Sequence, residues 1–206
     1  MLVVIEGPDA AGKKTQTEML AAKLRESHRT LLFSFPRYET VIGGLILADL
    51  KDKSPRTPER DMALQSLMST DKLDAVPEIK DALAHGDSVV CDRWWQSGVA
   101  YGVSDGLPAL WLCRLGSVLP EPNLNILIDV NPETALARRP EVRDRYEADR
   151  EKQKMVRTQY RLLWDAMSEV DDRWVVINGE RSIDEVHGAI VRTMKERIPS
   201  PRDPAW

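Results

Sequence analysis

The sequence GPDAAGKKTQ at residues 7–16 is a candidate phosphate-binding loop. Gly7, Gly12 and Lys13 match the pattern G-x-x-x-x-G-K, in which backbone N–H groups surround bound phosphate and the lysine reaches the β- and γ-phosphates. An apolar run, LVVIEG, leads directly into the first glycine, and a helical pattern begins near Lys13. A strand, a loop and a helix in this order predict a phosphate site at a helix N-terminus.

The loop departs from the pattern directly after its lysine. The pattern has a serine or threonine there, whose hydroxyl binds Mg²⁺, whereas this chain has Lys14 and places Thr15 one residue later. Each residue of an α-helix turns by about 100°, so Thr15 faces another direction. Either the match is accidental, or the site is inactive, or other residues hold the metal. The residues expected around the bound phosphates are Gly7, Ala10, Ala11, Gly12, Lys13, Lys14, Thr15 and Gln16.

Apolar runs alternate with helical patterns along the rest of the chain. Near-continuous Val, Ile and Leu runs are typical of strands buried on both faces of a parallel sheet. Runs of this kind occupy residues 2–7, 29–36, 87–93, 124–130 and 173–179. Helical patterns occupy residues 14–27, 58–85, 145–167 and 182–198, and we expect the second helix to bend at Pro77. The alternation predicts right-handed β-α-β crossovers and a three-layer α/β fold.

Length and composition favour one soluble, globular domain. The chain has 206 residues, of which 42% are hydrophobic and 30% are charged, and we expect a single domain over residues 1–197 with a frayed tail over 198–206. A net charge of -4 gives no support to a nucleic acid partner. No stretch approaches the roughly 18 apolar residues of a membrane span, and no basic leader precedes the first apolar run. These features predict a cytoplasmic protein.

Five further motifs follow the loop in order, and together they carry a resemblance. They are FPRYETVIG (35–43), DRWWQSGVAYG (92–102), PEPNLNILIDV (120–130), RYE (145–147) and INGERSIDEVH (177–187). With these motifs the chain resembles the thymidylate kinases from residue 2 to about residue 195. The resemblance implies a P-loop kinase that transfers the γ-phosphoryl group of ATP to dTMP, giving dTDP and ADP, with Mg²⁺. It also implies a five-stranded parallel sheet in the order 2-3-1-4-5 and a homodimer.

The resemblance further implies where the catalytic charge and the metal ligands lie. Many members have an arginine in the loop where this chain has Ala10, and members without it use arginines of a lid that closes over ATP. The matching stretch here is ARRPEVRDRYE, residues 137–147. Arginine suits this role because its planar group binds two phosphate oxygens at once. The implied lid residues are Arg143 and Arg145 for catalysis and Arg138 and Arg139 for ATP. The implied metal ligands are Asp9, Glu147 and, through water, Asp92.

The acceptor pocket is expected at the carboxyl end of the strand at 87–93. Arg93 follows this strand, where open α/β sheets bind their ligands, and the family match makes it a ligand of the dTMP phosphate. Tyr101 matches the aromatic residue that lies under the sugar and favours deoxyribose. Lys13, Asp9 and Arg93 complete the catalytic set. The other residues implied around dTMP are Asp9, Phe35, Pro36, Arg37, Tyr38, Met68, Lys72, Ser97, Gly98 and Tyr146, and Asn178 and Gly179 are implied beside ATP.

Two departures leave the identity of the base open. The family has a phenylalanine that stacks on thymine and an arginine four residues later that reaches O4, whereas this chain has Met68 and Lys72. The spacing of four still places both on one helix face, and a donor at O4 favours thymine over cytosine. The alternatives are a kinase for dUMP, a 5-modified deoxyuridylate or dGMP, or a non-catalytic nucleotide-binding subunit. A GTP switch is disfavoured because the chain has no Asn-Lys-x-Asp motif.

Overall fold

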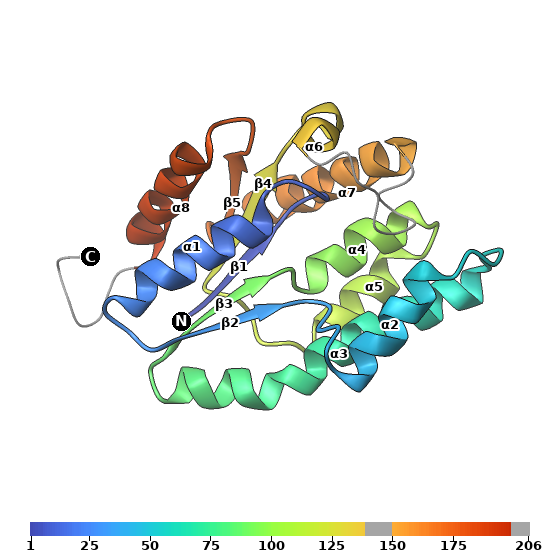
Figure 1. Ribbon diagram of the computed structural model, residues 1–206, viewed down its shortest axis with the longest axis horizontal. Coiled ribbons are helices and arrows are strands. Elements are labelled where there is room, and N and C mark those ends of the chain that lie inside the picture. The colour runs from blue at the N-terminus through green and yellow to red at the C-terminus, as the bar shows by residue number, and fades with distance from the viewer. Residues whose placement is uncertain (139–149, 199–206) are drawn as a thin grey trace.

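Five parallel strands form the centre of the molecule. The structure is a computed structural model, and it describes residues 1–138 and 150–198. The strands lie in the order β2-β3-β1-β4-β5, which confirms the predicted order and the three-layer α/β fold (Figure 1). Their bounds are β1 (Leu2–Glu6), β2 (Thr30–Ser34), β3 (Ser88–Asp92), β4 (Leu124–Asp129) and β5 (Trp174–Asn178). Most of the lid expected at 137–147 and all but the first residue of the tail expected at 198–206 lie outside the described residues.

Helices cover both faces of this sheet. Their bounds are α1 (Lys13–Arg25), α2 (Val41–Lys51), α3 (Pro58–Ala84), α4 (Trp95–Ser104), α5 (Ala109–Gly116), α6 (Pro132–Arg138), α7 (Arg150–Ser168) and α8 (Ile183–Arg197). The four predicted helices correspond to α1, α3, α7 and α8, and α8 has the expected capping box at Ser182. Pro77 lies inside α3 without ending it. No helix of residues 1–138 or 150–198 is long and apolar enough to cross a membrane.

The strand side chains alternate between two apolar layers. Val3 and Ile5 of β1 pack into the core beneath α1 and α8. Leu2 and Val4 point to the opposite side, where they pack with α3, and α4 and α7 cover the same face (Figure 1). A strand has a side-chain period of two, so the next residue, Glu6, falls on the α4 and α7 side. A carboxylate therefore lies within a layer that is otherwise built from apolar groups.

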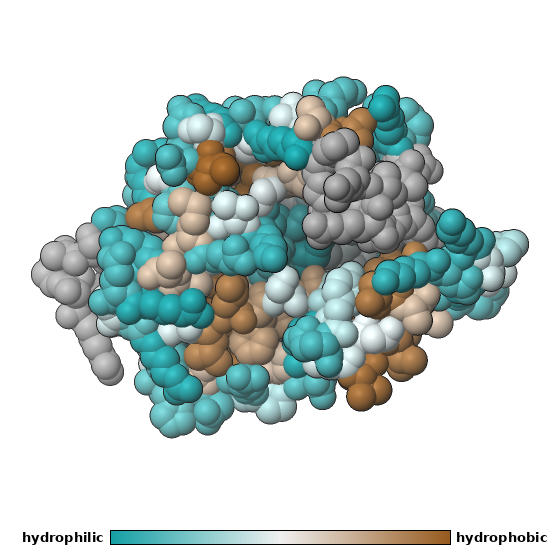
Figure 2. All heavy atoms as spheres, viewed as in Figure 1, coloured by the Kyte–Doolittle hydropathy of each residue, from teal (hydrophilic) through white to brown (hydrophobic). Residues whose placement is uncertain are grey.

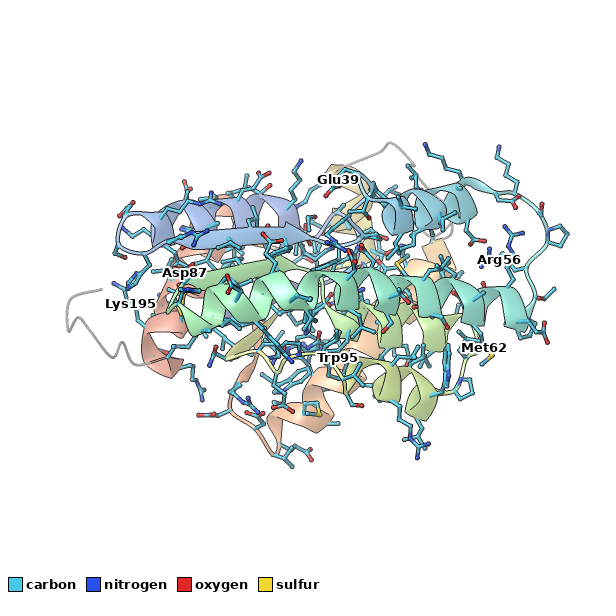
Figure 3. The ribbon with its side chains drawn as sticks, turned by 90° about the horizontal axis from the view of Figure 1, so that it is seen from below. Glu39, Arg56, Met62, Asp87, Trp95 and Lys195 are labelled. Carbon is cyan, nitrogen blue, oxygen red and sulfur yellow. The ribbon has the colours of Figure 1, made fainter. Side chains whose placement is uncertain are left out.

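Ion pairs join α2 and α3 near the loop that connects them. Arg56 donates to Asp49 Oδ2 at 2.6 Å, and its guanidinium also binds Asp61 at 2.7 Å. Arg60 donates to Asp49 Oδ1 at 2.9 Å and binds Asp52 as well. Figure 3 shows Arg56 at the end of the molecule, beside the loop that joins the two helices. We call these five residues the α2–α3 ion-pair cluster.

Trp164 fastens α7 to the edge of the sheet. Its side chain is fully buried, and its indole Nε1 donates to the carbonyl of Val175 in β5 at 3.1 Å. Its ring meets that of Trp174 edge-on, with 4.8 Å between the centroids, and the ring of Tyr160 lies 6.1 Å away. Removal of this side chain would leave a large cavity and an unpaired carbonyl.

We therefore expect Trp164→Ala to lower the free energy of unfolding by about 3–5 kcal/mol. Chemical denaturation followed by circular dichroism measures this change. Leu162→Ala is the matched control, because Leu162 lies on the same helix but is 58% exposed, and it should change stability by no more than about 0.5 kcal/mol. Equal losses in the two variants would show that Trp164 does not anchor α7.

Candidate active site

The loop after β1 has a backbone that depends on two glycines. A Cβ atom at Gly7 would lie 2.5 Å from the carbonyl oxygen of Ile128, so a larger residue cannot fit against β4. Gly12 precedes the first turn of α1 at a φ of +92°, in the left-handed region that glycine adopts without strain. Ala10 also lies in this region, at a φ of +57°. The loop thus makes a tight turn that brings the N-terminus of α1 to the cleft.

Lys13 lies folded against this loop. Its Nζ donates to the carbonyl of Gly7 at 2.9 Å and to that of Pro8 at 2.8 Å. Burial, together with the nearby positive charge of Arg93, lowers the pKa of Lys13 to about 8. Lys14 is exposed and lies 3.9 Å from Glu18 on its own helix. The structure therefore distinguishes one buried lysine, able to face phosphate, from an exposed lysine that also lines the cleft.

A buried carboxylate organises the floor of the cleft. Glu6 has no exposed surface, and its Oε1 accepts from the backbone N–H groups of Trp94 at 2.7 Å and Ser97 at 3.1 Å. Its Oε2 accepts from the hydroxyls of Ser97 at 2.6 Å and Tyr160 at 2.8 Å. A buried charge is tolerated only when it is well hydrogen-bonded, and these four bonds meet that need. They join β1, the start of α4 and α7 at one point.

Arg93 is held at this point in an unusual backbone conformation. Its φ is +70°, in the left-handed region that non-glycine residues adopt mainly where the surrounding structure enforces it. Its guanidinium forms an ion pair with Asp9 and donates to Ser97 Oγ at 3.2 Å and Tyr160 Oη at 3.3 Å. It also lies over the ring of Tyr101, 5.2 Å from the centroid. These contacts fix the guanidinium at the carboxyl end of β3.

Asp9 is the second carboxylate of the cleft. Its Oδ2 accepts from Tyr101 Oη at 2.7 Å and from Gln153 Nε2 of α7 at 3.0 Å. Burial alone raises the pKa of Asp9, but the charges of Arg93 and Lys13 outweigh it and lower the pKa below its ordinary value. Asp9 is therefore an anion that already has partners in this state of the protein.

The expected acceptor residues line the other half of the cleft. Lys72 is 4% exposed, and its Nζ lies 5.6 Å from the centre of the Phe35 ring and donates to the carbonyl of Met68 at 3.0 Å. Burial lowers the pKa of Lys72 to about 8. The cleft encloses about 1430 Å³, and Figure 2 shows a recess with polar walls near the middle of the molecule. Further predicted residues on its walls are Ala10, Ala11, Thr15, Gln16, Pro36, Tyr38, Ser97 and Gly98.

Two residues that were predicted to bind a nucleotide, Arg37 and Asn178, do not line the cleft. The Arg37 guanidinium binds Asp71 at 3.0 Å and Asp74 at 2.7 Å, and Arg37 does not line the cleft. The side chain of Asn178 accepts from the backbone N–H of Glu180 at 2.9 Å, which closes a turn. Arg138 does lie at the cleft, where it donates to the carbonyl of Gly179 at 2.8 Å.

Oxygen ligands suitable for a metal are present at the cleft. Asp92 Oδ1 is buried and has no hydrogen-bond partner among the described residues. Residues 1–138 and 150–198 hold no group of three acidic, histidine or cysteine side chains that could bind a metal by themselves. Asp9 and Asp92 with phosphate and water fit Mg²⁺, which needs few protein ligands. The other predicted residues, Arg139, Arg143, Arg145, Tyr146 and Glu147, lie outside the described residues.

Several residues that line or support the cleft were not among the predicted ones, and four of them bear on its chemistry. They are Glu6, Gln65, Gln153 and Tyr160. Glu6 has a sequence signal, because it is a charged residue at the end of an apolar strand and directly before the loop glycine. Gln65 has one too, since it precedes Met68 by three residues and so shares its helix face. Gln153 and Tyr160 follow an amphipathic pattern that indicates only a helix.

The family model described as Thymidylate kinase matches residues 5–190 of this chain. The chain belongs to the thymidylate kinase family. The zebrafish (Danio rerio) thymidylate kinase is 33% identical over 199 residues, which cover 96% of this chain and 90% of that protein. The human thymidylate kinase is 31% identical over 188 residues, which cover 90% of this chain and 85% of that protein.

A solved thymidylate kinase structure supports the same family and fold. The thymidylate kinase of Candida albicans superposes with a TM-score of 0.80 at 26% identity, over 95% of this chain and 91% of that one. The Candida structure reveals an origin of broad substrate specificity in that enzyme. The two proteins therefore share the same overall fold over nearly the whole of both chains.

The Glu6 network leads to a prediction for Tyr160→Phe. The loss of one buried hydroxyl removes a donor to Glu6 and a contact of Arg93, so we expect the free energy of unfolding to fall by about 1–3 kcal/mol. Thermal and urea denaturation measure the change. The control is Thr158→Val on the exposed face of α7, which should be nearly neutral. A Tyr160→Phe protein as stable as the wild type would show that this hydroxyl does not support the carboxylate.

Proposed function

We propose that this protein transfers the γ-phosphoryl group of ATP to dTMP, giving dTDP and ADP. One observation carries the proposal. A phosphate-binding loop with a buried lysine and a partly buried arginine at the end of the neighbouring strand line the same cleft, joined through Asp9. The spacing fits a donor phosphate on one side and an acceptor phosphate on the other. Family membership supports the choice of dTMP.

On the donor side, the loop amides and Lys13 bind the β- and γ-phosphates of ATP. Lys13 leaves the carbonyls of Gly7 and Pro8 when phosphate arrives, because an anion is a stronger partner than a carbonyl. Arg138 and the backbone at Gly179 lie where the nucleoside of ATP meets the protein. Phosphoryl transfer asks the protein mainly for positioning and for positive charge, and these groups supply both.

On the acceptor side, Arg93 binds the phosphate of dTMP. Its present partner, Asp9, gives way to that phosphate or shares the guanidinium with it, since the fork of arginine has several donors. Tyr101 contacts both Arg93 and Asp9. Its ring supports the sugar and favours deoxyribose over ribose. Phe35 and Met68 contact the base, and Lys72 donates to O4. Arg37 holds the loop at Phe35 against α3 through Asp71 instead of binding phosphate.

The metal and the lid complete the proposal. Mg²⁺ neutralises charge on the phosphates when bound, and Asp9 and Asp92 would hold it directly or through water. Glu147 is the third proposed ligand. Arg143 and Arg145 are proposed to supply the charge that Ala10 lacks, with Arg139 beside ATP and Tyr146 beside the acceptor. The family resemblance also supports a homodimer. The sequence features described above support a cytoplasmic protein with a single domain over residues 1–197.

The acceptor preference is tested by a panel of nucleoside monophosphates. We expect kcat/KM to be highest for dTMP, lower for dUMP, and much lower for dGMP, AMP and the ribose form of TMP. A coupled assay of ADP release measures it. Tyr101→Ala should narrow the difference between dTMP and its ribose form. Faster turnover of dGMP or AMP than of dTMP would overturn the assignment of the substrate.

The buried lysine predicts a pH dependence for the donor. Only the protonated amine binds phosphate, and the pKa of Lys13 is about 8 in the free protein. At saturating dTMP, kcat/KM for ATP should therefore fall as the pH rises through 8. The corresponding fall in kcat should occur at a higher pH, because bound phosphate raises the pKa of the amine.

Variants of two lysines on α1 check this assignment. Lys13→Met should lower kcat/KM by roughly 10²–10³ at pH 7 and abolish the fall near pH 8. Lys23 is exposed and paired with Glu26, so Lys23→Met should keep the wild-type profile. A Lys13→Met enzyme with wild-type turnover would contradict the proposed role of the loop.

A further inference from the structure

Gln65 is a buried polar residue that the roles above do not use. It lies on α3, it is only 4% exposed, and it lines the cleft. Its side-chain amide makes no hydrogen bond to any other residue in 1–138 or 150–198. The fully buried side-chain atoms that lack a partner do not include either polar atom of Gln65, so these atoms are open to the cleft. An unpaired amide on the wall of a binding cleft is therefore ready for a ligand.

The position of this amide is defined by a glycine on the opposite helix. A Cβ atom built on Gly98 of α4 would lie 3.5 Å from Oε1 of Gln65. The oxygen of the amide therefore lies within van der Waals contact of position 98. Since Gly98 has no side chain, nothing at that position covers the amide where both residues line the cleft.

Three residues of α3 form one wall at helical spacing. Gln65, Met68 and Lys72 follow each other at intervals of three and four, which places them on one face. Lys72 folds back by one turn, because its Nζ binds the carbonyl of Met68. Its ammonium group therefore comes within about one helical turn of Gln65. The wall offers a donor at one end, a thioether in the middle and an amide at the other end.

We propose that Gln65 reads the base of the acceptor nucleotide. Thymine and uracil present an N3–H donor between two carbonyl acceptors, and a glutamine amide matches this edge with one acceptor and one donor. Oε1 accepts from N3–H, and Nε2 donates to a neighbouring carbonyl of the base, while Met68 contacts the ring. This inference rests on the proposed function, since it concerns the acceptor of the same reaction.

The amide and the ammonium group divide the recognition between them. An amide that rotates by 180° can also pair with cytosine, which has an acceptor at N3 and a donor at C4. Lys72 is only a donor when charged, so it opposes the amino group of cytosine. Gln65 therefore contributes affinity for a hydrogen-bonding pyrimidine edge, and Lys72 contributes the choice between thymine and cytosine.

The test compares dTMP with its N3-methyl analogue, which cannot donate from N3. Equilibrium affinities by calorimetry and kcat/KM by ADP release are measured for the wild type and for Gln65→Met, which keeps the length of the side chain but loses both polar atoms. We expect the wild type to prefer dTMP strongly. In Gln65→Met the affinity for dTMP should fall roughly 10-fold, and the preference for dTMP over the analogue should shrink by at least that factor.

Two further variants keep the result interpretable. Gln65→Glu retains an acceptor of the same length without the amide donor, so its affinity for dTMP should fall as well, and it serves if Gln65→Met does not fold. Thr70→Val changes an exposed position of the same helix and should keep the wild-type preference. Melting temperatures of all variants confirm that the comparison is between folded proteins.

The outcomes separate this inference from the proposed function. If the wild type neither binds nor phosphorylates dTMP, the proposed function fails and this inference fails with it. If the wild type does both, but the folded Gln65 variants keep its preference for dTMP over the N3-methyl analogue, only the role of Gln65 is overturned. A change of preference in the Gln65 variants, and none in Thr70→Val, supports the inference.

Discussion

A single buried carboxylate sets the geometry of the cleft. Glu6 ends the central strand, and its two oxygens accept four hydrogen bonds from the start of α4 and from α7. Its negative charge also opposes the desolvation of Lys13 and Lys72, both buried nearby. In an interior of low dielectric, a fully satisfied network of this kind is rigid, whereas a partly satisfied one is costly. The positions of Arg93, Ser97 and Tyr160 relative to the loop thus follow from one residue.

Most of the fold could be predicted because its signals are local. Each strand is a short apolar run that ends at a turn, and the long helices α1, α3, α7 and α8 have clear periodicity or caps. Helices α2, α4, α5 and α6 could not be predicted in the same way. They are short, and Gly43, Gly44, Gly98 and Gly102 give α2 and α4 a weak intrinsic preference for helix. These two helices are stabilised by packing against α3 and α7, which sequence periodicity does not report.

In the site, too, residues in contiguous motifs could be predicted, whereas contacts between residues distant in the sequence could not. The loop residues and Arg93 are predicted because the chemistry is contained in a few adjacent positions. Arg37 was expected to contact phosphate, but it lies against Asp71 and Asp74, which are more than thirty residues away in the sequence. Gln153 binds Asp9 and Tyr160 binds Glu6, and both come from α7, which is more than 140 residues away from these carboxylates in the sequence. Partners of this kind become visible only once the chain is folded.

The α2–α3 ion-pair cluster makes the stability of this end of the molecule depend on temperature and on salt. Heat weakens the hydration of charged groups, so the cost of keeping Arg56 and Arg60 beside their carboxylates falls as the temperature rises. Dissolved ions act in the opposite sense, because they screen the attraction between partly exposed charges. This end of the protein is therefore better suited to a warm, dilute environment than to a cool, saline one.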